Sequence, residues 1–175
     1  MGSVHGSKWL TPIAFALALG AGCASSGVGS GALPDAKTVA ALELVDGDGR
    51  PYRLSELQGK VVLLDFWATW CAPCLESLPL YDTWQKDLGP KGLVVVAVSV
   101  DEEDAPVGDF ARKYAPNVTV LRDAKGDAAA LLGLPKMPTA FVIGRDGGVV
   151  ERRPGFTEEE AASLRASLVT LLEAP

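Results

Sequence analysis

The sequence VVLLDFWATWCAPC at residues 61–74 decides most of what can be said about this chain of 175 residues. Its first seven residues are apolar apart from Asp65, a pattern typical of a buried strand. Cys71 and Cys74 follow, and two thiols separated by two residues can close and open a disulfide. A helix is expected from Ala72, so Cys71 lies where free N–H groups and the helix dipole favour a thiolate. The segment therefore predicts a redox-active cysteine pair.

Three other interpretations of the pair have less support. A zinc site would need more ligands, and the remaining cysteine and histidine, Cys23 and His5, lie far back in the sequence. A purely structural disulfide would be expected to close a longer loop, because that restricts the unfolded chain more. Two buried apolar cysteines would not explain Pro73 between them or Trp67 and Trp70 before them. We therefore expect no metal site.

Residues 65–74, DFWATWCAPC, resemble the active-site segment of the thioredoxin superfamily, and in particular that of its TlpA/ResA-type exported reductases. The resemblance runs from about Val39 to the C-terminus. Pro79 stands where the family's active-site helix is kinked, and residues 137–139 (Met-Pro-Thr) match the cis-proline loop that faces the cysteines. The resemblance implies a thioredoxin-like α/β fold: a mixed central sheet flanked by helices, with an N-terminal β-hairpin and an αβ insertion.

The pattern of the remaining elements fits this fold. A second apolar run at residues 93–100 predicts another buried strand, and alternation of such strands with helices implies a parallel core. Thr157 and Glu160 form a capping-box pattern that opens a C-terminal helix with Leu164, Leu168 and Leu171 on one face. The expected strands are residues 39–45, 51–54, 61–67, 93–100, 118–121 (an edge or insertion strand), 139–143 and 148–152, and the other helices are residues 72–88, 104–114 and 127–132.

The N-terminus is expected to direct export. A weakly basic start and an apolar run at residues 9–19, too short to span a bilayer, predict a signal peptide over residues 1–22. Residues 19–23 (LGAGC) resemble a bacterial lipobox, in which Cys23 is lipidated and becomes the mature N-terminus. Gly20 stands where an aliphatic residue is usual, so ordinary cleavage to a soluble periplasmic protein and an uncleaved anchor remain alternatives.

The mature chain is expected to consist of a tether and one domain. Residues 23–38 are rich in Ser and Gly and predict a flexible tether, and residues 39–175 form the thioredoxin-like domain. Removal of residues 1–22 leaves 15 basic and 22 acidic side chains, a net charge of −7, so nucleic acid is not an expected partner. No histidine remains, so catalysis cannot use imidazole. In an oxidising compartment a dithiol stays reduced only if a donor supplies electrons, here a membrane thiol protein.

The resemblance gives each residue of the active-site segment a role. Cys71 is the nucleophile and Cys74 the thiol that resolves the mixed disulfide. Pro73 between them, with no histidine, indicates the reducing end of the family's range. Asp65 matches the buried aspartate of thioredoxin, which helps to deprotonate the resolving thiol. We expect a raised Asp65 pKa, because burial among residues 62, 64 and 66 disfavours its charge; an exposed strand position is the alternative.

Two departures from the family limit this analogy. Ala97 stands where thioredoxin has a lysine near the aspartate, so Asp65 would lack a cation. Ser77 stands where TlpA/ResA-type proteins usually have a glutamate, and Glu76 lies one position away, about 100° around the helix. Whether Glu76 replaces that glutamate stays open, and a role in cytochrome c maturation is weakened accordingly.

A substrate-docking rim is also implied by the resemblance. Pro138 would be cis, and Trp70 and Met137 would form an apolar rim for an extended substrate chain, with Pro73 and Thr139 beside it. Trp67 is expected in the core, and Trp84 allows either a core or a docking role.

The leading hypothesis is an exported thiol-disulfide oxidoreductase that mainly reduces protein disulfides through Cys-Ala-Pro-Cys. It would act as a monomer on the periplasmic side of a bacterial membrane, held there by a lipid on Cys23, and would need no cofactor. A disulfide oxidase or isomerase is the first alternative, disfavoured by Pro73. A thiol peroxidase lacks an arginine close in sequence to Cys71. The fourth possibility is a redox-inactive binding module.

Overall fold

The computed structural model describes residues 1–3, 32–123 and 125–174, and these contain all the elements discussed below. Most of the expected signal peptide, and Cys23 with the first part of the tether, lie outside the described residues. Helix α1 (Ala36–Ala40) begins inside the segment expected to be a tether, because the Asp35 side chain accepts a hydrogen bond from the Thr38 amide at 2.8 Å and caps the helix. Ordered chain therefore starts before Val39.

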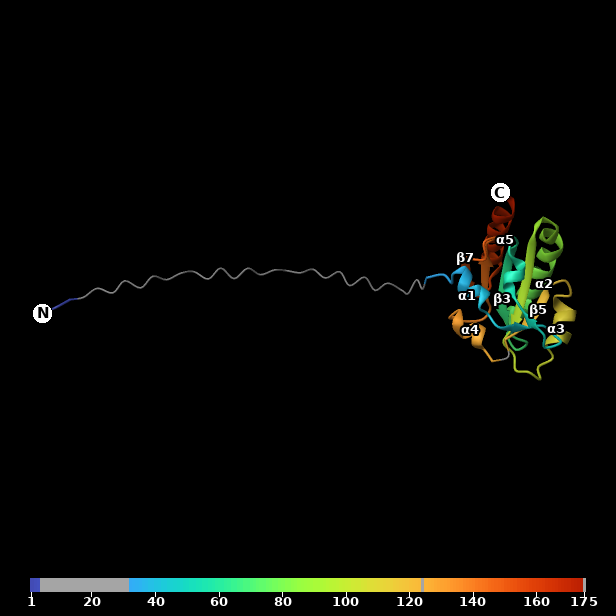
Figure 1. The fold of residues 1–175 in the computed structure, drawn as a ribbon, viewed down its shortest axis with the longest axis horizontal. Coiled ribbons are helices and arrows are strands. Elements are labelled where there is room, and N and C mark those ends of the chain that lie inside the picture. Colours follow the sequence, from blue (N-terminus) through green and yellow to red (C-terminus); the bar gives the residue numbers. More distant parts are fainter. Residues whose placement is uncertain (4–31, 124, 175) are drawn as a thin grey trace. The chain divides into compact units, whose positions relative to one another are not determined.

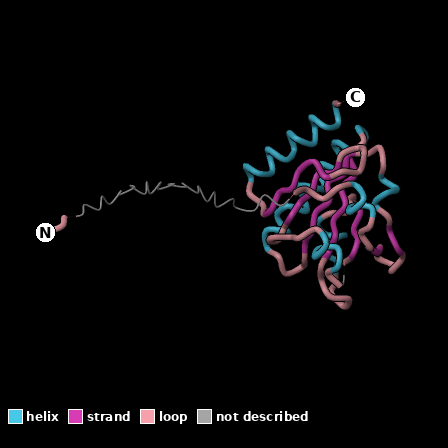
Figure 2. Tube along the Cα trace, turned by 60° about the vertical axis from the view of Figure 1, so that its left-hand side comes forward, coloured by secondary structure: helices cyan, strands magenta, loops and turns pink. Residues whose placement is uncertain are grey.

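The centre of the fold is a seven-stranded mixed sheet, with helices on both sides of it (Figures 1 and 2). Strands β3, β4 and β5 are parallel, whereas β6 is antiparallel to β3 and β7 to β6. The spatial order is β2-β1-β5-β4-β3-β6-β7. The strands are β1 (Leu44–Val45), β2 (Pro51–Tyr52), β3 (Val61–Trp67), β4 (Leu93–Ser99), β5 (Thr119–Arg122), β6 (Thr139–Ile143) and β7 (Val149–Pro154).

Strand β3 is the middle of the core, and every one of its seven residues is buried. Continuous apolar runs such as β3 and β4 are what a parallel sheet covered on both faces requires. Alternate side chains of β3 enter two different apolar layers: Leu63 and Trp67 face one, and Leu64 and Phe66 face the other. The predictions of both central strands are confirmed.

Helices α2 (Ala72–Leu88), α3 (Val107–Tyr114) and α5 (Glu158–Glu173) pack into the first layer, which also holds both cysteines of the motif. Helices α1 and α4 (Asp127–Leu131) and the 3-10 turn Leu54–Leu57 pack into the second layer. Helix α2 has the predicted bounds and continues through Pro79. The α/β class that the sequence predicts, a mixed sheet with helices on both faces, is thus confirmed.

The structure corrects two details of the sequence-based expectation and excludes one of its alternatives. Residues 39–43 are not a strand, because helix α1 and its following turn occupy them; the hairpin is reduced to β1 paired with β2. Of the two alternatives for residues 118–121, the edge strand is excluded, because β1 pairs with β5 through Val45 and Arg122. The third core leucine of α5 is Leu172, which follows Leu168 by four residues, while Leu171 is only partly buried.

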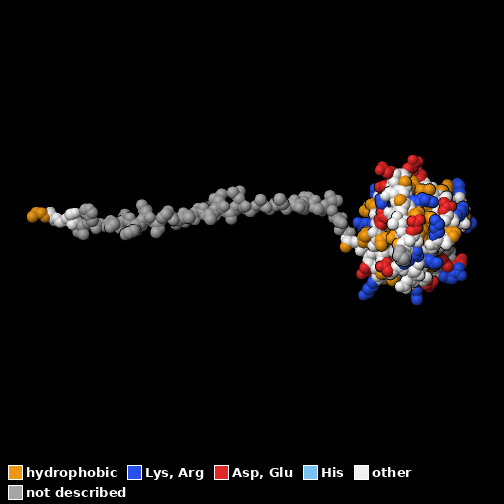
Figure 3. Space-filling view, turned by 90° about the horizontal axis from the view of Figure 1, so that it is seen from above, with side chains coloured by type: hydrophobic (Ala, Val, Ile, Leu, Met, Phe, Trp, Pro, Cys, Tyr) orange, Lys and Arg blue, Asp and Glu red, His pale blue; other side chains and the backbone are white. Residues whose placement is uncertain are grey.

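Helix α5 begins as the sequence predicts, with the Thr157 hydroxyl accepting a hydrogen bond from the Glu160 amide at 3.1 Å. On the face drawn in Figure 3, acidic and basic side chains are interspersed with apolar ones and do not form one large basic area. This fits the net charge of −6 for the whole sequence.

Candidate active site

The cysteine pair lies in the connection between β3 and α2. Cys71 is the N-cap residue of α2 and therefore lies at the positive end of the helix dipole. The first turn adds few free N–H groups, because Pro73 has none and the Cys74 amide donates to the Cys71 carbonyl at 3.0 Å. Cys71 and Cys74 form a disulfide with 5.3 Å between their Cα atoms. Cys71 retains 6% exposure, whereas Cys74 is fully buried one turn inside the helix. A partner molecule can therefore reach Cys71 first.

The loop before β6 contains the expected cis peptide bond between Met137 and Pro138. Strand β6 pairs with β3 so that Thr139 lies opposite Phe66, which brings Pro138 to the end of β3 from which the cysteine loop leaves. The Pro138 carbonyl accepts a hydrogen bond from the Gly155 amide at 2.7 Å. This hydrogen bond links the cis-proline loop, beside the end of β3, to the residue that follows β7.

The expected docking residues differ in exposure. Trp70 is 70% exposed and Pro73 is exposed, and Met137 is half-buried against the core layer that holds the cysteines. Thr139 is fully buried, and its hydroxyl donates a hydrogen bond to the Lys136 carbonyl at 2.6 Å. Its expected docking role is therefore corrected: Thr139 holds the cis-proline loop in shape.

The other two tryptophans near the site belong to the core. Trp67 is fully buried, as expected, and Trp84 is 2% exposed and packs against Tyr81 with 5.2 Å between ring centroids. The interpretation left open for Trp84 is thus decided in favour of the core.

Asp65 is fully buried on β3, in the layer that contains the cysteines. Neither of its carboxylate oxygens has a hydrogen-bond partner among the described residues, and the same holds for Nε1 of Trp67 on the same strand face. Desolvation raises the pKa of the Asp65 carboxyl well above its ordinary value. The alternative of an exposed strand position is excluded.

The neighbours expected for Asp65 need correction. Residues 62, 64 and 66 point to the opposite face of the sheet because strand side chains alternate. Asp65 instead shares its face with Leu63 and Trp67, and is paired across the sheet with Ala97 on β4 and Ala140 on β6. Residue 97 is an alanine, where thioredoxin has a lysine, so a methyl group and no cation lies beside the Asp65 carboxyl on β4.

The place of the family glutamate is occupied by Ser77. Ser77 is fully buried, and its hydroxyl donates to the Cys74 carbonyl at 3.1 Å. Glu76 is exposed on the outer side of α2, so it does not replace the missing carboxyl beneath Cys74. Asp65 is therefore a fully buried carboxyl on the strand face that points toward the cysteine layer.

Sequence reasoning missed Tyr81, one turn beyond Ser77 on the same side of α2. It is 1% exposed, and burial, followed by the nearby Asp65 carboxyl, raises the pKa of its hydroxyl well above the ordinary value. Tyr81 lies at the helical spacing i, i+3, i+7 from Cys74 and Ser77, on the buried side of α2, and this spacing is the sequence signal that could have identified it.

Sequence reasoning also missed the group that fixes the Trp70–Cys71 loop. Asp101 is 3% exposed and accepts hydrogen bonds from the Thr69 amide at 2.9 Å and the Thr69 hydroxyl at 2.7 Å. The Ser99 hydroxyl donates to the same carboxylate at 2.8 Å. Asp101 lies two residues after the end of β4, where carboxyl ends of parallel strands meet, which is a usable sequence signal.

Replacing this carboxylate tests its structural role. Asp101→Ala removes the acceptor of the half-buried Thr69 donors and of the buried Ser99 hydroxyl, so the free energy of unfolding is expected to fall by about 2–3 kcal/mol. Denaturant unfolding measures the change, with Glu102→Ala at the next, exposed position as the control expected within about 0.5 kcal/mol of wild type. Equal stability of the two variants would contradict the role given to Asp101.

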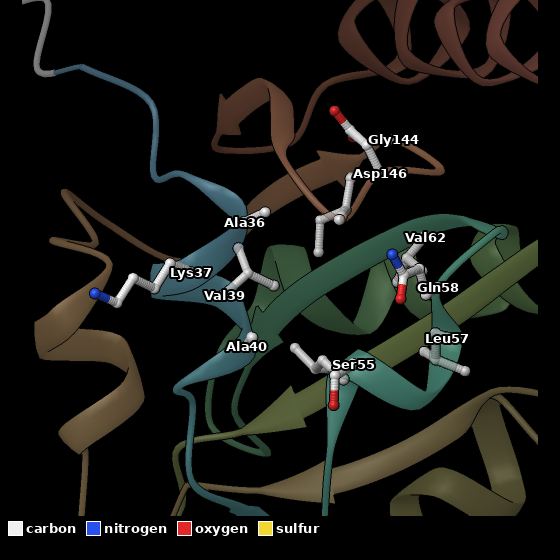
Figure 4. Close-up of a pocket in the computed structure, with 13 residues that line it drawn as sticks. Ala36, Lys37, Val39, Ala40, Ser55, Leu57, Gln58, Val62, Gly144 and Asp146 are labelled. Carbon is white, nitrogen blue, oxygen red and sulfur yellow. The ribbon is translucent and has the colours of Figure 1, made fainter.

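A second cavity, of about 280 Å³, lies on the other face of the sheet and is not part of this site (Figure 4). Helix α1, the 3-10 turn Leu54–Leu57 and the turn after β6 surround it, and Val62 lines it from β3. In Figure 4 the Lys37 ammonium points away from the cavity. The residues that line this cavity include no cysteine.

In the described ranges, no three His, Cys, Asp or Glu side chains are grouped so that they could hold a metal ion. None of the helices described is both long enough and apolar enough to cross a membrane. What the site offers is therefore a dithiol–disulfide couple above a buried carboxylic acid.

Comparisons with known proteins agree with this geometry. The Redoxin family model matches residues 28–168. The thiol-disulfide oxidoreductase ResA of Bacillus thuringiensis subsp. konkukian is 32% identical over 117 residues, which cover 67% of this chain and 68% of the relative.

Two solved structures extend the comparison. A protein from Chlorobium tepidum, described as a thiol:disulfide interchange protein DsbE, superposes with a TM-score of 0.74 at 33% identity, over 81% of this chain and 99% of that one. An exposed lipoprotein thioredoxin of Streptococcus pneumoniae has a TM-score of 0.60 at 36% identity, over 74% of this chain and 98% of that one.

Proposed function

Because the chain belongs to the Redoxin family of the thioredoxin superfamily, with ResA-type thiol-disulfide oxidoreductases among its relatives, we propose that it reduces disulfide bonds of exported proteins. The observation that carries this proposal is the Cys71–Cys74 disulfide at the start of α2, with Ala72 and Pro73 between the sulfurs. Oxidising relatives have a histidine between the cysteines that over-stabilises the thiolate, whereas here no histidine lies between Cys71 and Cys74.

The reaction follows from the placement of the two thiols. The Cys71 thiolate attacks one sulfur of a substrate disulfide, that S–S bond breaks, and the departing thiolate takes up a proton. Cys74 then loses its proton and attacks Cys71, which releases the second substrate thiol and leaves the disulfide seen here. Two electrons pass to the substrate, so a thiol donor must reduce the pair again.

The position of the protein in the cell is part of the proposal. Residues 1–22 would act as an export signal, and Cys23 would carry a lipid that holds the domain at the periplasmic side of a bacterial membrane. The Streptococcus pneumoniae relative, a lipoprotein by its name, supports this placement. A membrane thiol protein would then be the electron donor, and disulfide-containing exported proteins the substrates.

The reduction potential of the Cys71–Cys74 couple tests the direction of transfer. We expect a value near the reducing end of the family, about −270 mV, and far from about −120 mV, which marks a strong oxidant. Equilibration with dithiothreitol or glutathione buffers, followed by alkylation and mass spectrometry, gives this value. A potential near the oxidising end would support an oxidase, and failure of the pair to exchange would support a binding module.

A further inference from the structure

A groove of about 610 Å³ runs between α2 and α5, which lie side by side in the fold (Figure 1). Glu76, Leu80 and Trp84 line it from α2, each four residues after the last, so they form one stripe of that helix. Ala162 and Arg165 line it from α5. No step of the reaction proposed above uses this groove.

The floor of the groove is apolar. Trp84 is almost fully buried beneath it, and Leu80 and Phe156 are partly buried against the same core layer. Phe156 packs edge-on against Tyr81 with ring centroids 6.4 Å apart, which fixes the floor to α2. Small side chains at Ala161 and Ala162 leave the space open, so a side chain of leucine size could be buried there.

One end of the groove adjoins the cysteine site. Glu76 is two residues beyond Cys74, and Phe156 follows Gly155, whose amide donates to the Pro138 carbonyl of the cis-proline loop. The opposite end is marked by Arg165, which lies 3.8 Å from Asp87 near the end of α2. The two helices therefore run in the same direction, and a chain bound at the cysteines can continue into the groove.

The end near the cysteines is acidic. Glu76 and Glu158 are both exposed there, and among the described residues neither forms an ion pair. Lys136 is the basic group of the cis-proline loop, and its side chain lies over Gly155, outside the groove lining. A ligand with a cation near the two carboxylates and an apolar side chain on the floor would complement both the acidic end and the apolar floor of the groove.

We propose that this groove binds the polypeptide next to the substrate's disulfide, with an apolar side chain on the floor and a lysine or arginine between Glu76 and Glu158. This inference rests on the proposed reductase function, and it names the substrate class that the site prefers: disulfides flanked by an apolar and a basic residue. The groove adds contacts beyond the rim of Trp70 and Met137, so it selects among substrates without taking part in bond breaking.

The test compares three peptides, each with one cysteine linked to mercaptoethanol and flanked by Leu-Arg, Leu-Glu or Gly-Ser. The second-order rate constant for their reduction by the prereduced protein is measured at low ionic strength. We expect the Leu-Arg peptide to react about tenfold faster than the Leu-Glu peptide, and the double variant Glu76→Lys/Glu158→Lys to reverse this order. Added salt should reduce the difference.

Matched variants separate the groove from general charge effects. Glu159→Lys/Glu173→Lys makes the same total charge change, +4, at two exposed residues outside the groove lining, and should leave the peptide order as in wild type. Ala162→Trp fills the groove and should remove the advantage of the Leu-Arg peptide over Gly-Ser, whereas Ala166→Trp one turn later should not. Equal effects within either pair would overturn the proposal.

Two further measurements keep this proposal distinct from the proposed function. Neutral hydroxyethyl disulfide should be reduced equally by all the variants, and failure of the wild-type protein to reduce it would reject the reductase function alone. A cysteine-free Leu-Arg peptide should bind the oxidised protein in calorimetry and lose about tenfold in affinity with Glu76→Lys/Glu158→Lys. Unchanged or absent binding would reject the groove even if reduction is normal.

Discussion

Cys74→Ser is expected to accumulate stable mixed disulfides with substrate proteins through Cys71, whereas Cys71→Ser should reduce turnover by a factor on the order of 10³ or more. The reason is positional: Cys71 is the helix N-cap and keeps some exposure, and Cys74 is fully buried behind it. The helix dipole stabilises the Cys71 thiolate, and removal of the Cys74 sulfur leaves nothing to release the trapped partner.

Non-reducing electrophoresis and mass spectrometry of the trapped species check this expectation. The double variant Cys71→Ser/Cys74→Ser serves as the control and should trap nothing. If Cys71→Ser traps partners as well as Cys74→Ser does, the roles of the two thiols are reversed.

The centre of the fold could be predicted because its signals are local and long. The apolar run of β3 and the helix that ends before Gly89-Pro90 gave Val61–Trp67 and Ala72–Leu88 without error. Both elements span many residues of one pattern, so the fold class and the place of the cysteines followed from them. The cis bond before Pro138 came from the family resemblance, because sequence alone favours trans.

The periphery of the fold could not be predicted in the same way. Helix α1 and strands β1 and β2 have between two and five residues, too few for a periodic pattern. The hydrogen bonds from Thr69 to Asp101 join residues 32 positions apart; the place of Asp101 after β4 indicates a residue at this edge of the sheet, but not Thr69 as its partner. Thr139 was misjudged because its strand position, which decides which way the side chain points, depends on the register with β3.

The prediction for Asp65 was correct about its burial and its pKa and wrong about its neighbours. An acid inside an apolar run predicted a buried carboxyl with a raised pKa, and the structure confirms the burial and the direction of the shift. The prediction of which residues surround Asp65 was wrong, because it took residues adjacent in the strand, and their side chains point to the opposite face of the sheet. The correction strengthens the functional interpretation, since it places the carboxyl in the layer of Cys74.

Asp65→Asn is expected to slow resolution of the mixed disulfide about a hundredfold, by removing the group that accepts the Cys74 proton. The first attack by Cys71 should be unchanged, because that thiolate is stabilised at the helix N-terminus and not by Asp65. Rapid mixing with a disulfide substrate measures both steps. As a matched control, the attack step is measured alone in variants that lack Cys74. Its rate constant should be the same in Cys74→Ser and in Asp65→Asn/Cys74→Ser.

Stability as a function of pH provides an independent measurement on the same residue. The unfolded chain loses the Asp65 proton near pH 3.9, about the ordinary value, whereas the folded chain holds it to a higher pH. Between these two pKa values the unfolded state binds fewer protons than the folded state, so stability falls by about 1.4 kcal/mol per pH unit. The contribution of Asp65 is thus complete below about pH 4 and lost as the pH rises to its folded pKa.

The amide introduced by Asp65→Asn cannot ionise, so the stability of this variant relative to wild type should increase from about pH 4 toward about pH 7. Any fixed cost of burying the amide is the same at both pH values and cancels from this difference. Denaturant unfolding at several pH values gives the slope. A constant difference across that range would mean that the folded protein ionises Asp65 as readily as the unfolded chain does. Normal resolution kinetics in the same variant would then show that the buried carboxyl is not the proton acceptor of Cys74.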